Sequence, residues 1–448
     1  MRLTLVQPAM GHRPGGGYLR SWQMEPLPIA TLAGLTPPGV ELRFHDDRME
    51  RIPFDEPTDA VALPVETYTA RRAYEIASEF RRRGVPVVLG GFHPTLMPDE
   101  AARFGESIVT GEAESVWAEV LDDLRHGTLK RRYHGERTDL SGLRVDRSLF
   151  RDKRYLPIGL IETGRGCPFV CEFCAIQTFF GHQYRARPVA DVVRELAALR
   201  GTRKLFFFVD DNFAGDLRAG RELLPELAPL RLRWITQMSI NAAHDDAFVA
   251  LLARAGCRGV LIGFESLEPE NLQQMRKPFN TLGGGYAAAL GNLRRHGIAV
   301  YGTFVFGYDH DTAASFAEAV AFAEEQGMYI AAFNHLTPFP GTPLYQRLAD
   351  ERRLRFEAWW LDLAYRYNEV PFAPKALSPQ DITRGCVAAR KRFYRWPGIL
   401  RRSLRNAADG FMFRNFFPIN ALHRREISLR HGYPLGDQTW RGPLLEVG

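Results

Sequence analysis

Three cysteines stand close together in the segment TGRGCPFVCEFC, which runs from Thr163 to Cys174. Cys167, Cys171 and Cys174 are separated by three and then two residues, so their thiolates can wrap one corner of a cubane iron–sulfur cluster. Four cysteines would saturate such a 4Fe-4S cluster, whereas three leave one iron open to a substrate or cofactor. The alternative is a zinc site, for which nearby His182 is the candidate fourth ligand. This spacing is unusual for zinc, so we expect the cluster.

The residues around these cysteines resemble the radical S-adenosylmethionine (SAM) superfamily. Besides the spacing, the resemblance includes the aromatic Phe173 before the last cysteine and the Gly-containing segment 164–166 before the first. It implies that the open iron chelates the amino and carboxylate groups of SAM. One electron from the cluster then cleaves SAM to methionine and a 5′-deoxyadenosyl radical, which abstracts hydrogen from unactivated carbon. Because the cofactor carries this chemistry, no catalytic side chain is assigned.

Polar residues follow the β-rich runs downstream of the cysteines, as in VDDN (209–212) and GFES (263–266). Gly263 permits close approach of the backbone to a ligand, and Glu265 can accept hydrogen bonds from a ribose or an ammonium group. By the resemblance, this region lines the SAM pocket. The expected SAM-binding residues are Phe173, Asp210, Gln237, Ser239, Gly263, Glu265, Ser266 and Phe304. The alternatives are a structural salt bridge for Glu265 and a capping turn for residues 210–212.

A second ligand-binding pattern lies in VPVVLGGFHPTLMPDE (85–100), where an apolar run ends in a Gly-Gly turn before a helix. The segment SIVTGEAES (107–115) repeats this arrangement. Loops at the carboxyl ends of parallel strands are where open sheets bind ligands. Together with the cysteine motif, these turns resemble the class of radical SAM enzymes that has a cobalamin-binding domain. The resemblance implies cobalamin contacts from Pro64, Gly90, Gly91, Phe92, His93, Gly111 and Glu112.

One departure concerns the lower ligand of cobalt. The chain has no Asp-x-His pair, so the Asp-x-His-x2-Gly signature of methionine-synthase-like cobalamin sites is absent. We expect His93 to pack or to form hydrogen bonds as a loop residue rather than to bind cobalt. A cobalamin-type fold that has lost its cofactor is the alternative.

The spacing of apolar runs predicts an α/β fold with a doubly wound, parallel-sheet N-terminal domain. A partial (β/α)6 TIM-type barrel and a C-terminal cap follow. The expected units are a cobalamin-binding-type domain (1–128), a polar linker without periodicity (129–155), the radical SAM barrel (156–342) and the cap (343–448). The expected N-terminal strands are 3–7, 40–45, 60–64, 85–89 and 107–109. The expected barrel strands are 158–163, 204–210, 233–239, 259–265, 299–307 and 329–337.

Composition narrows the partners and the compartment. The 448 residues are 45% hydrophobic and 25% charged, which suits a soluble globular protein of two or three domains. The longest apolar runs are strand-length, and the N-terminus lacks the apolar core of a signal peptide, so we expect a cytoplasmic protein. The net charge of +6 is spread along the chain, which argues against the dense basic stripe that is typical of a nucleic-acid-binding protein.

The region from 390 to 431 alternates arginine with aromatic and aliphatic residues. Such a segment suits a pocket for an anionic or lipid-like small molecule, a peripheral contact with a membrane surface, or plain packing on the barrel. By the resemblance, the leading reaction is cobalamin-dependent methyl transfer to unactivated carbon. The alternative is a radical cyclase, ring contractase or oxidase, with or without cobalamin. Either reaction implies an electron donor such as flavodoxin or ferredoxin. A cluster-based redox or iron sensor is disfavoured, because a sensor needs no barrel.

Overall fold

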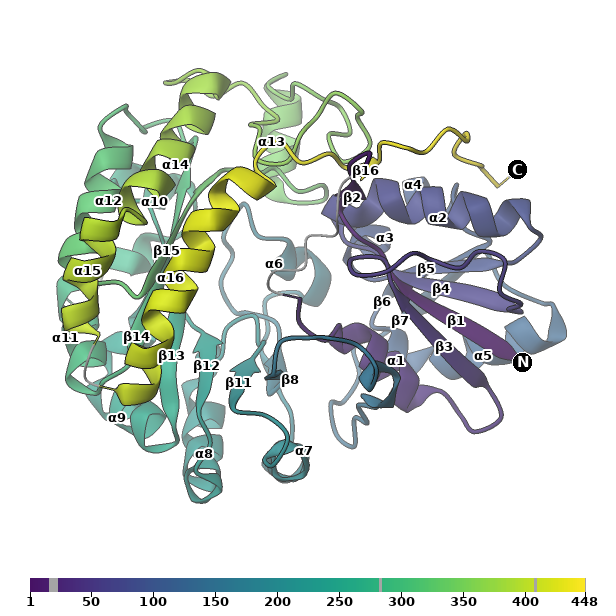
Figure 1. Cartoon of the computed structure of the whole chain (residues 1–448), viewed down its shortest axis with the longest axis horizontal. Helices are drawn as coiled ribbons and strands as arrows, with labels where there is room; N and C mark the ends of the chain where they lie inside the picture. Colours follow the sequence, from purple (N-terminus) through teal and green to yellow (C-terminus); the bar gives the residue numbers. More distant parts are fainter. Residues whose placement is uncertain (16–22, 282–283, 407–408, 448) are drawn as a thin grey trace.

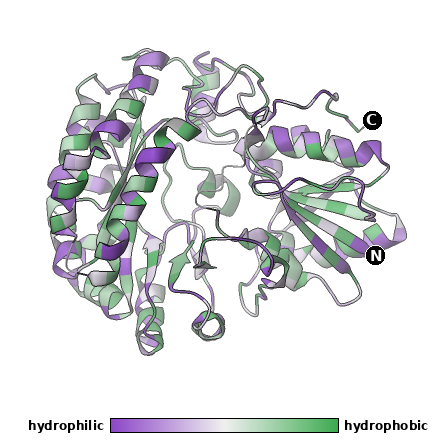
Figure 2. Ribbon diagram, viewed as in Figure 1, coloured by the Kyte–Doolittle hydropathy of each residue, from purple (hydrophilic) through white to green (hydrophobic). Residues whose placement is uncertain are grey.

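The computed structural model describes residues 1–448 except 16–22, 282–283, 407–408 and 448. Two α/β bodies lie side by side, with the N-terminal sheet in one and the cysteine-bearing sheet in the other (Figure 1). Along the helices of both bodies, hydrophobic residues alternate with hydrophilic ones (Figure 2). Helices of this kind bury one face against a sheet and leave the other in water.

The N-terminal body is a six-stranded parallel sheet in the order β3-β1-β4-β5-β6-β7. Side chains alternate between its faces, as in β4, where Val61 and Leu63 belong to one core and Ala60 and Ala62 to the other. This arrangement confirms the doubly wound sheet. Its strands are β1 (Arg2–Gln7), β3 (Glu41–Asp46), β4 (Ala60–Pro64), β5 (Val87–Gly90), β6 (Ser107–Gly111) and β7 (Arg132–Gly135). Its helices are α1 (Leu27–Leu35), α2 (Ala70–Arg82), α3 (Phe92–Leu96), α4 (Pro98–Ala101) and α5 (Trp117–His126).

The second body is a curved sheet of six parallel strands in the order β15-β14-β13-β12-β11-β8. It confirms the partial (β/α)6 barrel, since each strand pairs with the next one along the chain. The strands are β8 (Ile158–Ile161), β11 (Leu205–Phe208), β12 (Trp234–Gln237), β13 (Cys257–Glu265), β14 (Ala299–Phe306) and β15 (Ile330–His335). The helices between them are α6 (Ala175–Phe180), α7 (Val189–Leu199), α8 (Leu217–Leu227), α9 (Asp246–Arg254), α10 (Pro269–Gln274), α11 (Gly285–Arg295) and α12 (Ser315–Glu325).

The segment 129–155, expected to be a linker without regular structure, contributes to the N-terminal body. Strand β7 pairs with β6, and the side chains of Tyr133 and Phe150 are buried in the core on one face of the sheet. The expectation was wrong because a four-residue edge strand is too short to show periodicity. Its pairing with β6 comes from tertiary contact rather than from a local signal.

The C-terminal region, expected as a cap without predicted elements, is largely helical. It forms α13 (Pro343–Asp350), α14 (Pro379–Phe393), α15 (Trp396–Arg405) and α16 (Gly410–Arg430). Between α13 and α14 the chain returns to the N-terminal body, where Trp359 and Trp360 are buried. Beyond α16, β16 (Gly436–Asp437) pairs with β2 (Gly11–His12). Across the described residues, no helix is both long and apolar enough to cross a membrane.

Candidate active site

The three cysteines lie in the loop that follows β8, at the carboxyl ends of the barrel strands. Cys171 is buried, whereas Cys167 and Cys174 are half-buried. Asn212, just after β11, donates a hydrogen bond from its Nδ2 to the Cys167 Sγ at 3.6 Å. Burial raises the pKa of Cys171 to about 11 and that of Cys174 to about 12, and the neighbouring thiols add to both shifts. The neighbouring thiols therefore make ionisation of Cys171 and Cys174 less favourable. A bound metal would replace the protons of the three thiols.

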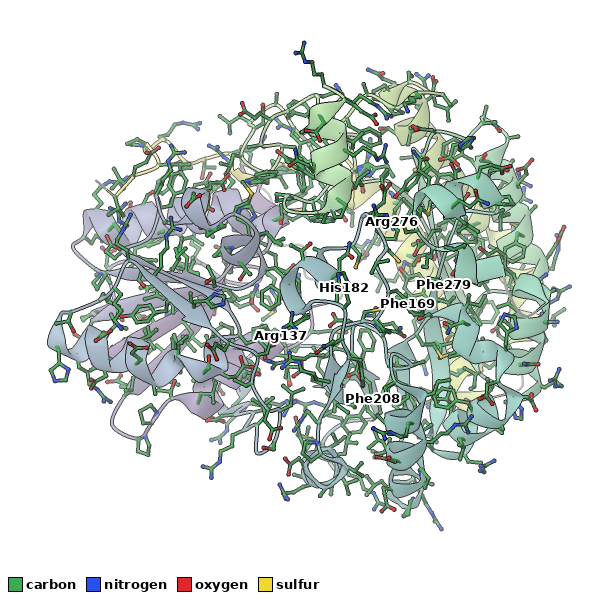
Figure 3. All side chains as sticks on the ribbon, turned by 180° about the vertical axis from the view of Figure 1, so that it is seen from behind. Arg137, Phe169, His182, Phe208, Arg276 and Phe279 are labelled. Carbon is green, nitrogen blue, oxygen red and sulfur yellow. The ribbon has the colours of Figure 1, made fainter. Side chains whose placement is uncertain are left out.

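The donor set fits an iron–sulfur cluster better than zinc. Across the described residues, no three Cys, His, Asp or Glu side chains are gathered at metal-binding distance. His182, the candidate fourth ligand for zinc, is exposed beyond α6 (Figure 3). Three soft thiolates in one loop match the ligands that iron–sulfur clusters use.

Asp210, expected to contact SAM, is buried and already bonded within the chain. Its carboxyl accepts hydrogen bonds from the Thr163 amide at 2.6 Å, from the Thr163 hydroxyl, and from the Tyr184 hydroxyl at 2.9 Å. Burial raises the pKa of Asp210 to about 7. Its neighbour Asp211 accepts from the Gly166 amide at 2.7 Å. The two carboxyls therefore hold the stem of the cysteine loop.

Gln237 is the last residue of β12, and Ser239 lies two residues beyond it, beside the same loop. Asn212 links them to it, because its Nδ2 donates to the Ser239 Oγ at 2.6 Å and its Oδ1 accepts from the Ser239 amide at 3.1 Å. Gln237 donates from Nε2 to the Asp210 carbonyl oxygen at 2.7 Å. The sequence grouped Asn212 with the polar residues that follow this strand, with a capping turn as the alternative. Only the pairing of β11 with β12 shows that it connects Cys167 to Ser239.

Glu265 forms the buried salt bridge that was the alternative to a SAM contact. Its carboxylate lies 2.7 Å from the Lys277 Nζ, which also donates to the Gly263 carbonyl oxygen at 2.9 Å. A Cβ on Gly263 would stand 2.1 Å from the Glu265 Oε1, so the missing side chain makes room for this ion pair. No local signal in the sequence identified Lys277.

The backbone at Glu265 is unusual. Its φ is +63°, and the pairing of β13 with β14 shifts register between Gly263 and Glu265. A bulge re-aims a side chain, and a positive φ at a residue other than glycine costs about 1–3 kcal/mol, which the surrounding structure must offset. Such strain is concentrated at functional sites. The side chain of Ser266, the next residue, already has a hydrogen-bond partner nearby, since its Oγ accepts from the Glu268 amide at 3.1 Å.

Phe304 does not face the interior of the barrel, which corrects the expectation that it binds SAM. Its side chain is 0% exposed and stacks against Phe264 and Phe333 in the core behind the sheet. Alternation along β14 places Thr303 and Val305 on the opposite face instead. Phe173 is half-buried against the same core.

The expected cobalamin-binding turns lie at the edge of the N-terminal sheet that is formed by the carboxyl ends of β4, β5 and β6. Pro64 pairs with Gly90 in neighbouring strands, and both are half-buried. The Phe92 ring stacks on Phe179 of α6, with centroids 4.4 Å apart. Since α6 begins directly after Cys174, this edge contacts the helix that follows the cysteine loop.

His93 is held inside the N-terminal body. Its ring is 0% exposed, with Nε2 2.9 Å from the Glu100 Oε1 and Nδ1 3.3 Å from the Thr67 Oγ1. Its ring also lies edge-on to Trp360. This geometry matches the packing role that the sequence favoured, and it corrects the choice of His93 as a residue that touches cobalamin.

The glycines at these turns are required by the chain's own packing. Gly111 has a φ of +72°, and a Cβ there would stand 2.1 Å from the Gly135 carbonyl oxygen of β7. Gly91 has a φ of +99°, and its Cβ would stand 3.2 Å from the Val65 backbone. Close approach of a ligand is therefore not needed to explain either residue.

Glu112, also expected to contact cobalamin, forms ion pairs with the barrel body. Its carboxylate lies 3.0 Å from Arg165 and also pairs with Arg185. Arg165 lies two residues before Cys167 and binds Glu162 and Glu114 as well, at 2.8 and 2.5 Å. The turn after β6 is thus fixed to the stem of the cysteine loop.

Comparison with known proteins agrees with this geometry. The model of the Radical SAM superfamily matches residues 161–323. The chain is 32% identical, over 87% of each chain, to the bacteriochlorophyllide d C-12(1)-methyltransferase of Chlorobaculum tepidum. The chain belongs to the radical SAM superfamily. A second Chlorobaculum tepidum protein, the bacteriochlorophyllide d C-8(2)-methyltransferase, is 30% identical over 85% of this chain and 88% of its own.

Among solved structures, the fold is similar to that of the radical SAM methyltransferase TsrM of Kitasatospora setae, whose structure has cobalamin and a [4Fe-4S] cluster bound. The TM-score is 0.66 at 19% identity, over 95% of this chain and 99% of that one. The likeness therefore extends over both α/β bodies. Membership of the superfamily makes the chain an enzyme that uses a 4Fe-4S cluster and SAM.

The radical SAM barrel encloses a cavity of about 710 Å³ between the inner face of its sheet and α16. On β12 the cavity is lined by Ile235, and on β13 by Leu261. Two residues further along these strands, on the same face, stand Gln237 and Gly263. Two residues of a strand span about 6.6 Å, so the cavity lies one layer of side chains away from the expected SAM pocket.

Proposed function

We propose that this radical SAM enzyme transfers a methyl group to a carbon atom of a largely apolar small molecule, with cobalamin as a further cofactor. The observation that carries the proposal is similarity to two methyltransferases over most of the chain. Both α/β bodies are retained, and the edge of the N-terminal sheet contacts the cysteine loop through Glu112 and Phe92. A radical enzyme that did not use the N-terminal body would have no reason to fix this edge so closely to its cluster loop.

Each cofactor has candidate residues in the structure. When bound, the cluster and SAM supply a 5′-deoxyadenosyl radical, and cobalamin supplies the methyl group. The three cysteines hold the cluster, and the residues at the ends of β11, β12 and β13 orient SAM. The half-buried edge of Pro64, Gly90 and Phe92 faces α6 and suits one side of a flat corrin ring. Glu112 and His93 position this edge without touching the ring.

The cavity inside the barrel is the proposed substrate site. Its volume of about 710 Å³ lies within the range of small-molecule pockets. Its walls are mostly apolar, with aliphatic side chains from the strands facing Met412, Ile419 and Leu422 of α16. A few polar groups, including Arg390 and His423, also line the cavity and would orient the ligand. These walls favour a substrate with an extended ring or alkyl surface, which accords with the pigment substrates named for the two relatives.

The electron donor is proposed to approach the cluster loop from outside. Val170, next to Cys171, is 40% exposed. Beside it is a recess of about 510 Å³ lined by His182, Arg276 and Gln346, among others. Basic side chains around an exposed apolar residue suit an acidic carrier such as flavodoxin or ferredoxin.

The reaction class is tested without knowledge of the substrate. Anaerobically reconstituted protein, supplied with hydroxocobalamin, is reduced and given SAM with a deuterated methyl group. We expect the label on the bound cobalamin, S-adenosylhomocysteine in equal amount, and slow formation of 5′-deoxyadenosine. Cys171→Ala should abolish the 5′-deoxyadenosine. Protein that stays free of cobalamin yet cleaves SAM to 5′-deoxyadenosine would instead be a radical cyclase or oxidase.

The substrate site is tested with 1-anilinonaphthalene-8-sulfonate, a fluorescent anion whose aromatic rings bind to apolar sites. Ala332→Trp and Leu422→Trp fill the cavity from opposite walls and should each weaken binding of the probe at least about tenfold by occupying its volume. Leu363→Trp, at an exposed position outside the cavity, is the matched control. Unchanged affinity in both cavity variants would place the apolar site elsewhere.

A further inference from the structure

Helix α15 presents a row of large apolar side chains to solvent. Trp396, Leu400 and Leu404 are 49%, 57% and 79% exposed, and their spacing of four residues places them along one face. The opposite face, with Ile399 and Arg402, is buried against the rest of the protein. Single exposed leucines are ordinary, but an aligned row on one helix marks a contact surface.

The same face is strongly basic. Beside the apolar row runs a second row of exposed residues, Pro397, Arg401 and Arg405. Between residues 391 and 408 the sequence contains six Lys or Arg residues, of which five are exposed and Arg402 is buried, and it contains no Asp or Glu there. We call the two rows together the α15 face. Apolar side chains mixed with arginines and lacking any acidic residue complement a surface that is both apolar and anionic.

The α15 face is held rigidly. The buried guanidinium of Arg402 donates to the carbonyl oxygens of Met328, Tyr329 and Phe393 at 2.9, 3.2 and 3.1 Å, and to the Asn420 Oδ1 at 3.1 Å. It also lies 3.7 Å from the centre of the Phe393 ring. These contacts fix the orientation of α15, so its apolar row cannot turn inward without breaking them. The helix lies on the outside of the barrel body, away from the N-terminal body (Figure 1).

We propose that the α15 face docks this enzyme on the surface of an anionic lipid bilayer. A ten-residue helix is about 15 Å long, enough to lie in the interfacial region but too short to span a bilayer. Trp396 suits the depth of the headgroups, Leu400 and Leu404 reach the acyl boundary, and Arg401 and Arg405 meet lipid phosphates. A nucleic acid would leave the leucines in water, and the groove of an acidic protein would bury less of their apolar surface than lipid would.

The docking connects to the proposed substrate site, although it does not depend on methyl transfer. Helix α16 follows α15 in the chain and forms one wall of the apolar cavity. An apolar substrate partitions into bilayers, so docking would bring the cavity close to its supply. The membrane proposal is tested by binding alone, and its failure would leave the assignment of the reaction untouched.

The test is co-sedimentation of the full-length, cluster-loaded protein with phosphatidylcholine vesicles that contain half phosphatidylglycerol. We expect binding that weakens with salt and is at least about tenfold weaker to pure phosphatidylcholine. Leu400→Ser combined with Leu404→Ser should reduce binding at least about tenfold, as should Arg401→Glu combined with Arg405→Glu. Lysines at both arginine positions should preserve it. The control is Leu363→Ser, which removes an exposed leucine that is not on α15.

Cluster content and uncoupled SAM cleavage should be unchanged in all of these variants, since none of the substituted residues lines the cavity or the cysteine loop. Equal binding to neutral and anionic vesicles, or unchanged binding in the leucine pair, would overturn the proposal. A wild-type dimer that the leucine pair converts to a monomer, without vesicle binding, would assign the α15 face to a second copy of the chain instead.

Discussion

The carboxylate of Glu112 lies 3.0 Å from Arg165, across the boundary between the two α/β bodies. Glu112 belongs to the turn after β6, whereas Arg165 lies two residues before the first cluster cysteine. The ion pair is buried on both sides, with side chains 4% and 9% exposed. It connects the proposed cobalamin edge directly to the stem of the cluster loop.

Glu112→Gln should therefore lower the stability of the protein by about 1–3 kcal/mol, because the buried Arg165 and the half-buried Arg185 lose a charged partner. We also expect faster loss of iron in air. Thermal unfolding and the decay of cluster absorbance measure the two effects. Glu119→Gln, which breaks an exposed pair with Lys130 in the same body, should change stability much less, because solvent screens this pair. Equal effects from both variants would assign Glu112 no special role.

Replacing Cys167, Cys171 or Cys174 with Ala should abolish binding of a 4Fe-4S cluster, since each thiol is expected to ligate one iron. Cys257→Ala and Cys386→Ala are the matched controls, as both thiols are buried in the barrel core away from the loop. Iron and sulfide analysis after anaerobic reconstitution measures the outcome. A full complement of iron in any of the three loop variants would remove that cysteine from the ligand set.

Glu265→Gln and Lys277→Gln separate a SAM contact from a structural pair. If Glu265 contacts SAM from its strained position, its variant should weaken SAM binding by about 1–3 kcal/mol, while Lys277→Gln should act mainly on stability. Both affinities are measured by anaerobic equilibrium dialysis. Equal loss of stability with unchanged affinity in both variants would make the ion pair purely structural.

Asp210 should make stability fall as the pH rises. Burial raises the pKa of its carboxyl from 3.8 to about 7, so between about pH 4 and pH 7 the folded protein keeps a proton that the unfolded chain releases. Asp210→Asn, which carries no charge, should therefore gain stability relative to wild type by at least about 1 kcal/mol between pH 5 and pH 8. The difference in unfolding temperature at the two pH values measures this. Asp122→Asn, at an exposed position on α5, should show no such trend.

Bound cobalamin should carry no histidine on cobalt, because His93 is buried with both ring nitrogens engaged. The electron paramagnetic resonance spectrum of the reduced, bound form should show no nitrogen superhyperfine splitting that comes from histidine, so His93→Asn should leave the spectrum unchanged. Gly91→Leu is unsuitable as a probe of the cofactor, since it would strain the backbone near Val65. A nitrogen splitting that disappears in His93→Asn would show that the loop rearranges around the cofactor.

The sequence alone determined the class of chemistry and the α/β fold. The Cys-x3-Cys-x2-Cys spacing lies within eight residues, so it specifies its metal group without knowledge of the fold. The barrel strands could also be predicted from the sequence, because runs such as β13 and β14 are apolar, strand-length and separated by amphipathic helices.

Tertiary structure decided which side chains meet. Phe304 turned out to face the outer core, since only the register of β14 shows which face a side chain takes. Lys277 reaches Glu265, and Arg165 reaches Glu112 from 53 residues away, through contacts that no local pattern encodes. For the same reason, the sequence did not predict strand β7, the return of Trp359 to the N-terminal body or the exposed row on α15. Burial is a property of the assembled fold, because it depends on which distant segments cover a residue.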